Sequence, residues 1–140
     1  MSEELYFIIP GRVVPKQSTR FGNGRAYQSK RVTDYEKKVV NAFKEEYPHH
    51  PLPIWPDRDT PIQLVCNFYF AIPKSASRKK QEDMLLNQRP TKVPDLDNCC
   101  KAVSDAVKKV LFPDDAQIVS TRLDKYWSKE DRVEVTIRSL

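Results

Sequence analysis

The sequence predicts one small α+β domain over residues 1–140, in which a mixed β-sheet is packed by two main helices. Two windows, 62–72 and 132–138, alternate apolar and polar side chains as strands do. Two others, 33–47 and 97–111, repeat apolar residues at the three- and four-residue spacing of helices. The length of 140 residues suits a single domain with its own core.

The first half of the chain predicts a strand, an arm and a helix. Residues 5–9 form the strand, which ends at a Pro-Gly pair. Residues 15–27 mix basic and aromatic side chains with two of the three glycines, and we expect a flexible arm there. The helix begins at Thr33, which has capping-box spacing with Glu36, and the five prolines of residues 48–61 predict a loop after it. Its apolar positions are Tyr35, Val39, Ala42, Phe43 and Tyr47.

The second half predicts three strands and two helices. The strand at 62–72 is expected to be central in the sheet, since both of its faces carry apolar side chains. Residues 75–86 are predicted to form a short basic helix. The strands at 117–127 and 132–138 follow the last helix and are joined by a charged turn. That last helix, at 97–111, has a predicted buried stripe of Cys100, Val103, Ala106, Val107, Val110 and Leu111.

The net charge of +5 is unevenly distributed along the chain. Residues 11–44 carry nine basic and two acidic side chains, and residues 73–92 carry six basic and two acidic. Residues 93–131 carry six basic and eight acidic. Basic segments are often only solvated surface, but cations interleaved with aromatic residues suit contact with a phosphate backbone. The predicted DNA-binding residues are Lys16, Arg20, Arg25, Lys30, Arg31, Lys74, Arg78, Lys79 and Lys80.

Candidate metal ligands lie in the acid-rich segment. Asp95 and Asp97 stand where an extended stretch turns into the N-terminus of the last helix, and Asp114 and Asp115 follow the end of the same helix. A helix of about fifteen residues is roughly 22 Å long, so the fold would have to carry Asp115 back toward Asp95 for these carboxylates to converge. Carboxylates without nearby His or Cys favour Mg²⁺ or Mn²⁺ over zinc.

Each acidic residue also has an ordinary structural interpretation. Asp97 could be a helix N-cap, and the aspartates at 114–115 could form a turn after a proline. Lys101 lies one helical turn after Asp97; it could form an ion pair with it, or stand beside a metal site and offset charge on a phosphate. We interpret Asp105 as part of a surface charge ladder with the lysines on either side of it.

The run PDLDNCCKAVSDAV at 94–107, followed by DDAQI at 114–118, resembles the RusA family of Holliday junction resolvases. The opening IPGRVVPK, the arm RFGNGRAY and the closing Lys-Tyr with its final strand are also similar, so the resemblance spans nearly the whole chain. One departure is Ser-Thr-Arg at 18–20, where many relatives carry Arg-Pro-Arg.

The resemblance implies a RusA-like endonuclease domain in which Asp95, Asp97 and Asp115 hold the metal and Lys101 is the catalytic lysine. It implies a homodimeric, Mg²⁺-dependent endodeoxyribonuclease, with Mn²⁺ as a possible substitute, that resolves four-way DNA junctions by paired symmetric nicks in recombination and repair. A C₂ dimer offers two identical sites to two equivalent strands.

The sequence also allows two other function classes to be compared with a nuclease. A protein that binds branched DNA without cutting it would need only the basic segments, with the aspartates as caps and turns; cleavage with and without EDTA separates the two hypotheses. A phosphatase of the haloacid dehalogenase type is disfavoured, because its nucleophilic aspartate follows a buried strand near the chain start, and here Lys-Val-Pro precedes Asp95.

Composition limits the cellular setting. No apolar run approaches the roughly 18 residues of a membrane span, and the acidic N-terminus is not that of a signal peptide. The three cysteines suit a reducing compartment, so we expect a cytoplasmic protein, bacterial or phage-encoded. Cys99 and Cys100 are adjacent, which is not zinc-site spacing, and are interpreted as core residues.

Overall fold

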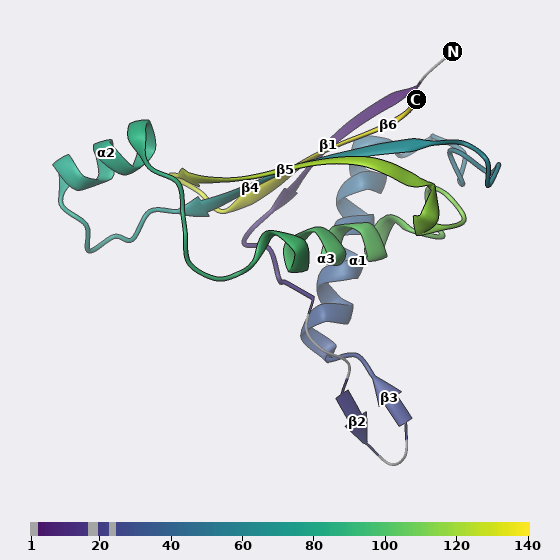
Figure 1. Cartoon of the computed structure of the whole chain (residues 1–140), viewed down its shortest axis with the longest axis horizontal. Coiled ribbons are helices and arrows are strands. Elements are labelled where there is room, and N and C mark those ends of the chain that lie inside the picture. Colours follow the sequence, from purple (N-terminus) through teal and green to yellow (C-terminus); the bar gives the residue numbers. More distant parts are fainter. Residues whose placement is uncertain (1–2, 17–19, 23–24) are drawn as a thin grey trace.

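The computed structural model describes residues 3–16, 20–22 and 25–140, with the backbone alone for 20–22 and 25–27 (Figure 1). It confirms one small α+β domain with a mixed four-stranded sheet. The elements are β1 (Glu4–Pro10), β2 (Arg20–Gly22), β3 (Arg25–Tyr27), α1 (Lys30–Glu46), β4 (Ile62–Ala71), α2 (Arg78–Asn87), α3 (Leu96–Val107), the 3₁₀ turn η1 (Asp115–Gln117), β5 (Ile118–Ser128) and β6 (Arg132–Ser139).

The main sheet has the strand order β1-β6-β4-β5. β4 is central, as predicted: it pairs in parallel with β5 and antiparallel with β6. β1 pairs antiparallel with β6, so the first and last strands are neighbours. β5 and β6 are consecutive in sequence but are separated in space by β4.

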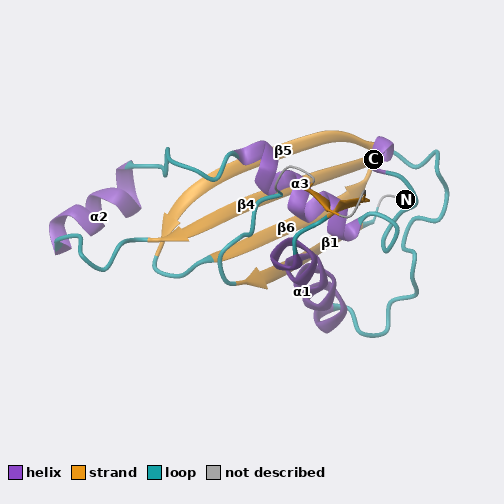
Figure 2. Cartoon of the chain, turned by 90° about the horizontal axis from the view of Figure 1, so that it is seen from below, coloured by secondary structure: helices purple, strands orange, loops and turns teal. Residues whose placement is uncertain are grey.

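α1 and α3 cover the same face of the sheet (Figures 1 and 2). Strands β1, β4 and β6 alternate strictly, with every second side chain buried beneath these helices. Each large apolar side chain in this layer contributes roughly 1.5–3 kcal/mol when it is fully buried. The fully buried residues include Phe7, Phe43, Phe68, Val103, Val135 and Ile137.

Both long helices differ at one end from the sequence prediction. α1 is capped by Ser29, whose Oγ accepts a hydrogen bond from the N–H of Val32 at 3.4 Å, so the predicted start at Thr33 is wrong. α3 ends at Val107 rather than at residue 111, because Lys109 adopts a positive φ of 70° and its N–H bonds the carbonyl of Phe112 at 2.7 Å. The buried stripe of α3 contains Cys99 in place of the predicted Cys100; its members are Cys99, Ala102, Val103, Ala106 and Val107.

Two smaller elements project from the helix–sheet body. β2 and β3 form a short antiparallel hairpin within the predicted arm. α2, the predicted basic helix, is capped by Ser77 and buries only Met84. In Figures 1 and 2, α2 extends beyond the end of β4, and the start of α3 lies between α2 and the hairpin.

The register defines two ends of the sheet. At one end the last residues of β4 and β5 are paired, Ala71 with Ser128, and β1 ends opposite the start of β6. We call this the carboxyl end, because β1, β4 and β5 all finish there. At the opposite end Ile62 pairs with both Ile118 and Ser139. The candidate site lies at the carboxyl end.

Candidate active site

The two aspartates at the start of α3 take no part in capping it by their side chains. Asp95 is the N-cap residue, with an extended backbone at φ −70° and ψ 145°, and its carbonyl accepts a hydrogen bond from the N–H of Cys99 at 3.0 Å. Its carboxylate makes no capping hydrogen bond. Asp97 lies in the first turn, so its interpretation as the N-cap is wrong. A carboxylate there is stabilised by the positive end of the helix dipole.

Both carboxylates are exposed. Among the side chains that the structure describes, neither accepts a hydrogen bond or lies within 4.0 Å of a cationic nitrogen. Asp97 and Lys101, both described by the structure, therefore do not form an ion pair with each other. The oxygens of Asp95 and Asp97 keep their lone pairs for an external ligand.

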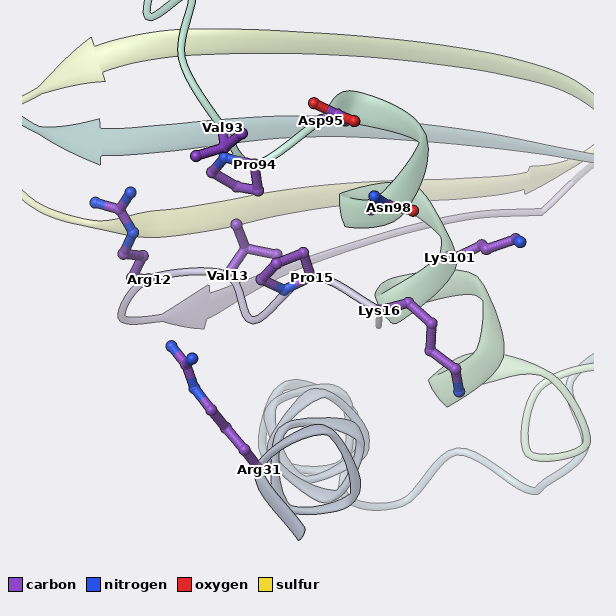
Figure 3. A pocket seen from close by; sticks show the side chains of 10 residues that line it. All are labelled: Arg12, Val13, Pro15, Lys16, Arg31, Val93, Pro94, Asp95, Asn98 and Lys101. Atoms are coloured by element: carbon purple, nitrogen blue, oxygen red, sulfur yellow. The ribbon is translucent and has the colours of Figure 1, made fainter. Parts of the chain in front are cut away.

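A cleft of about 650 Å³ opens beside the start of α3 (Figure 3). One wall is the beginning of α3 with Pro94 before it, and the other is the segment that follows β1. Asp95 is the single carboxylate among the described lining residues, and the surrounding cations are Arg12, Lys16, Arg31 and Lys101. The cleft thus offers positive charge to an anion and an oxygen ligand at its rim.

Lys16 braces the cleft and is less available to DNA than the sequence suggested. Its backbone N–H donates to the carbonyl of Asn98 at 3.0 Å, which ties the segment after β1 to α3. Its Nζ lies 3.1 Å from Asp105 and 3.4 Å from Glu36, and its side chain is only 23% exposed. Asp105 therefore pairs with Lys16 and not with a ladder of neighbouring lysines.

The loop that leads into α3 is anchored from the sheet. The Nζ of Lys125, on β5, donates to the carbonyl oxygens of Lys92 at 2.6 Å and Pro94 at 2.9 Å. These are the residues just before Asp95. This role of Lys125 could not be predicted from the sequence, because nothing local signals a contact across some thirty residues of chain.

Asp115 lies far from Asp95 within the chain. It begins η1, beyond the C-terminal end of α3, and its Oδ2 is 3.7 Å from the Nζ of Lys108. The twelve residues of α3 span about 18 Å. The strand β5 gives a second measure of the separation: Asp115 lies just before Ile118, Lys125 contacts the residues before Asp95, and the step from Ile118 to Lys125 spans about 23 Å. The described residues contain no group of three or more His, Cys, Asp or Glu able to hold a metal ion.

Asp114 and Gln117 build the turn at that far end. The Oδ1 of Asp114 accepts a hydrogen bond from the N–H of Ala116 at 3.0 Å, which lowers the pKa of the Asp114 carboxyl. Gln117 Oε1 accepts from the N–H of Asp114 at 3.0 Å, so the pair forms a capping box. The turn interpretation of Asp114 is confirmed.

The predicted DNA-binding cations lie in several parts of the fold. Lys30 and Arg31 are exposed at the start of α1. The side chains of Arg20 and Arg25 fall outside the described residues. The predicted cations on and before α2 are all exposed; they are Lys74, Arg78, Lys79 and Lys80. Arg12 was missed, although the basic stretch of residues 11–44 contains it; its guanidinium carbon lies 5.0 Å from the centroid of the Phe70 ring.

Cys66 and Cys99 belong to the core and Cys100 packs against it, where core positions were predicted for Cys99 and Cys100. Burial raises the pKa of the Cys99 thiol to about 11, and burial also raises the pKa of Cys66 and Cys100. Cys99 and Cys66 are fully buried and Cys100 is half-buried, and all three are free thiols. Thiols with raised pKa values are poor metal ligands and poor nucleophiles.

The site combines a basic cleft with two carboxylates that have no partner among the described side chains, at a helix N-terminus, an arrangement that suits the binding of phosphate esters. A family model described as endodeoxyribonuclease RusA matches residues 10–138. The chain belongs to the RusA family of endodeoxyribonucleases. This membership does not favour the hypothesis of a non-cleaving DNA-binding protein.

One curated relative is an uncharacterized protein of Bacillus subtilis (strain 168), YqaN. It is 37% identical over 83 residues, which cover 57% of this chain and 58% of YqaN. The matched region is therefore less than two thirds of that protein. Among the described residues, no helix is both long and apolar enough to cross a bilayer.

Proposed function

We propose that the protein is a divalent-metal-dependent endodeoxyribonuclease that binds four-way DNA junctions and resolves them by paired symmetric nicks. The observation that carries the proposal is the free carboxylate of Asp95 in a cleft whose other charged lining residues are all cations, in a chain of the RusA family. A polyanion avoids carboxylates unless a cation lies between them, so a free carboxylate in a basic cleft fits a metal site.

The residues at the start of α3 fit a magnesium or manganese ion. Mg²⁺ in phosphoryl chemistry commonly takes one or two carboxylates and completes its shell with water and substrate phosphate. Asp95 and Asp97 supply two carboxylates without competing partners among the described side chains. When bound, such an ion supplies Lewis acidity at the phosphate and lowers the pKa of a water molecule.

The cations of the cleft have distinct roles in this mechanism. Lys101 is positioned to stabilise the additional negative charge of the pentacovalent transition state, because it lines the same cleft as Asp95 and has no ion pair in the described chain. Arg12 and Arg31 bind the phosphates that flank the scissile bond. Lys30 and the cations of α2 extend this contact along the DNA arms.

A third carboxylate, from Asp115, requires a second copy of the chain. The separation of about 20 Å between the two ends of α3 prevents Asp115 from joining Asp95 in one protomer. In a homodimer with twofold symmetry, the partner's Asp115 can complete each site, and the two sites are equivalent. Two equivalent sites match two equivalent strands at a four-way junction.

The test compares wild-type protein with Asp97→Asn on a labelled four-way junction and on its linear arms, resolved on a denaturing gel. In Mg²⁺, we expect paired nicks in the junction from wild-type protein and none from Asp97→Asn. EDTA should abolish nicking by wild-type protein without preventing junction binding. Glu45→Gln, an exposed carboxylate near the far end of α1, is the matched control and should cut normally.

Two results would contradict the proposal. Undiminished nicking by Asp97→Asn would overturn the site assignment. Tight binding of the junction by wild-type protein with no cleavage in Mg²⁺ or Mn²⁺ would instead support a protein that only binds branched DNA.

A further inference from the structure

A second cleft, of about 720 Å³, adjoins the first at the carboxyl end of the sheet. It lies between α2, the ends of β4 and β5, and the loop before α3. Arg12 and Val93 line both clefts, so the two are neighbours on either side of these residues. The volume lies in the range of sites that enclose one small organic ligand, and it is too small for a double helix.

The inner wall of the second cleft is aromatic and apolar. Trp127, at the end of β5, is half-buried and presents part of its indole ring to the cleft. Phe70, at the end of β4, and Met84, from α2, are 2% and 6% exposed and close the wall behind it. The flat indole ring of Trp127 can stack on any planar π-system of similar size.

The rim of the cleft is cationic, and no Asp or Glu is found among its described lining residues. Two of its cations have structural partners: Arg89 lies 3.4 Å from Asp124, and Lys125 donates to two backbone carbonyls. Arg12, Lys80 and Lys92 have no ion pair among the described residues. Three uncompensated cations around an aromatic wall select a ligand that is both flat and anionic.

An unstacked nucleotide has this combination of a planar base and flanking phosphates. In a duplex, the bases are stacked and expose only their edges, so an aromatic wall within a cleft can be reached only by a base that has left the stack. The exchange point of a branched DNA is where stacking between arms is interrupted, and it lies next to the strand to be cut. The second cleft similarly lies beside the candidate site of cleavage, since it is lined by Val93, two residues before Asp95.

We propose that the second cleft binds one unstacked nucleotide of the DNA strand whose phosphate occupies the first cleft. Its base stacks on Trp127, and its phosphates contact Arg12, Lys80 and Lys92. The inference rests on the proposed function, since it takes the first cleft as the place of the scissile phosphate. It adds a base-contacting subsite, which accounts for the position of a half-buried aromatic ring in a cleft beside a phosphate-binding one.

The test measures binding of two labelled eight-nucleotide strands in EDTA, one of deoxythymidine and one with the same backbone and abasic sugars. Wild-type protein should bind the first about fivefold or more tightly, because stacking on one aromatic side chain is worth at least that factor. Trp127→Ala should remove the preference and Trp127→Phe should keep most of it. Trp55→Phe is the matched control, because Trp55 lines neither cleft.

A measurement without substitutions covers the case in which Trp127→Ala does not fold. A junction carrying bromodeoxyuridine at its exchange point is irradiated with wild-type protein, and the crosslinked peptide is identified by mass spectrometry. The expected crosslink is to Trp127. A crosslink found only outside the residues that line the second cleft would overturn the proposal, as would equal binding of the two strands by wild-type protein.

The two proposals can fail separately. Nicking of junctions in Mg²⁺ without any preference for the strand that carries bases would support the proposed nuclease and overturn the proposed subsite. A base preference that depends on Trp127, without nicking in Mg²⁺ or Mn²⁺, would support the proposed subsite and overturn the proposed nuclease.

Discussion

Lys125 holds the residue that precedes Asp95: its Nζ, on β5, lies 2.9 Å from the carbonyl oxygen of Pro94. The same nitrogen bonds the carbonyl of Lys92 at 2.6 Å. The loop entering α3 is therefore fixed to the sheet by one charged side chain at the point where a candidate metal ligand begins the helix. Charge-assisted hydrogen bonds of this kind are stronger than those between neutral groups.

Lys125 is thus expected to act as a positioning residue for Asp95. Lys125→Met should raise the Mg²⁺ concentration needed for half-maximal nicking by about tenfold or more, the usual effect of removing a group that orients a ligand. Lys125→Arg should recover part of the loss, since it can still donate to the carbonyls. Titration of nicking with Mg²⁺, alongside urea denaturation, checks this. Lower stability with an unchanged Mg²⁺ requirement would show a purely structural role.

Mixing two inactive variants tests whether Asp115 acts across a dimer. Asp95→Asn and Asp115→Asn should each be inactive alone. If each site combines Asp95 of one chain with the partner's Asp115, a mixed dimer has one intact site and one doubly altered site. We expect the mixture to regain single nicks without paired resolution. If the three carboxylates act within one chain, both sites of the mixed dimer are damaged and no nicking returns.

Gln117 is expected to stabilise the fold rather than to take part in cleavage. Its side chain is 5% exposed, and its Nε2 donates to the carbonyls of Asp57 at 3.0 Å and Thr60 at 3.1 Å. Gln117→Ala removes the donor to the Thr60 carbonyl and leaves the Asp57 carbonyl only its bond from the Thr60 N–H at 3.2 Å, so it should lower the free energy of unfolding by about 1–3 kcal/mol. Urea denaturation measures the change. Gln88→Ala, at an exposed position, should change it by less than about 0.5 kcal/mol.

His50 is expected to make part of the stability depend on pH. Its Nε2 lies 2.7 Å from Glu3, and this hydrogen bond raises the pKa of His50 above 6.5. Because the folded state binds the proton more tightly, the stabilisation is complete below the unfolded pKa, near 6.5, and is lost as the pH rises through the folded value. The denaturation midpoints of wild-type protein and His50→Gln should therefore differ at acidic pH and converge at alkaline pH. His49→Gln, at an exposed position, is the control for the substitution itself.

Much of the fold could be predicted because its signals are local. The alternation in β4 and β6 and the helical spacing in α1 and α3 predicted elements within a few residues of their observed bounds. Helix ends were less predictable, since Ser29 competes with Thr33 as a cap and the left-handed turn at Lys109 has no sequence signature. The three-residue strands of the β2–β3 hairpin are too short to show an alternation.

The candidate site was predictable only where it lies within one segment. Asp95, Asp97 and Lys101 share a single helix start, so their proximity follows from the helix itself. The position of Asp115 depends on which end of β5 lies beside which end of β4. Because the two strands pair in parallel, Asp115 lies at the end of the sheet opposite to Asp95. Lys16 and Lys125 contact residues that are far from them in the sequence. Arg12 likewise lines clefts whose other walls come from distant segments, so none of these contacts follows from a local pattern.

The pairing of the first strand with the last has a consequence for how the chain reaches this structure during synthesis. β1 leaves the ribosome first, yet its described partner in the sheet is β6, some 120 residues later in the chain. Until then, its alternating apolar face has no strand beside it, and the sheet cannot close. Contacts between such distant segments slow folding. A nascent chain halted within β5 is therefore expected to remain protease-sensitive, and release of β6 is the event that makes the domain resistant.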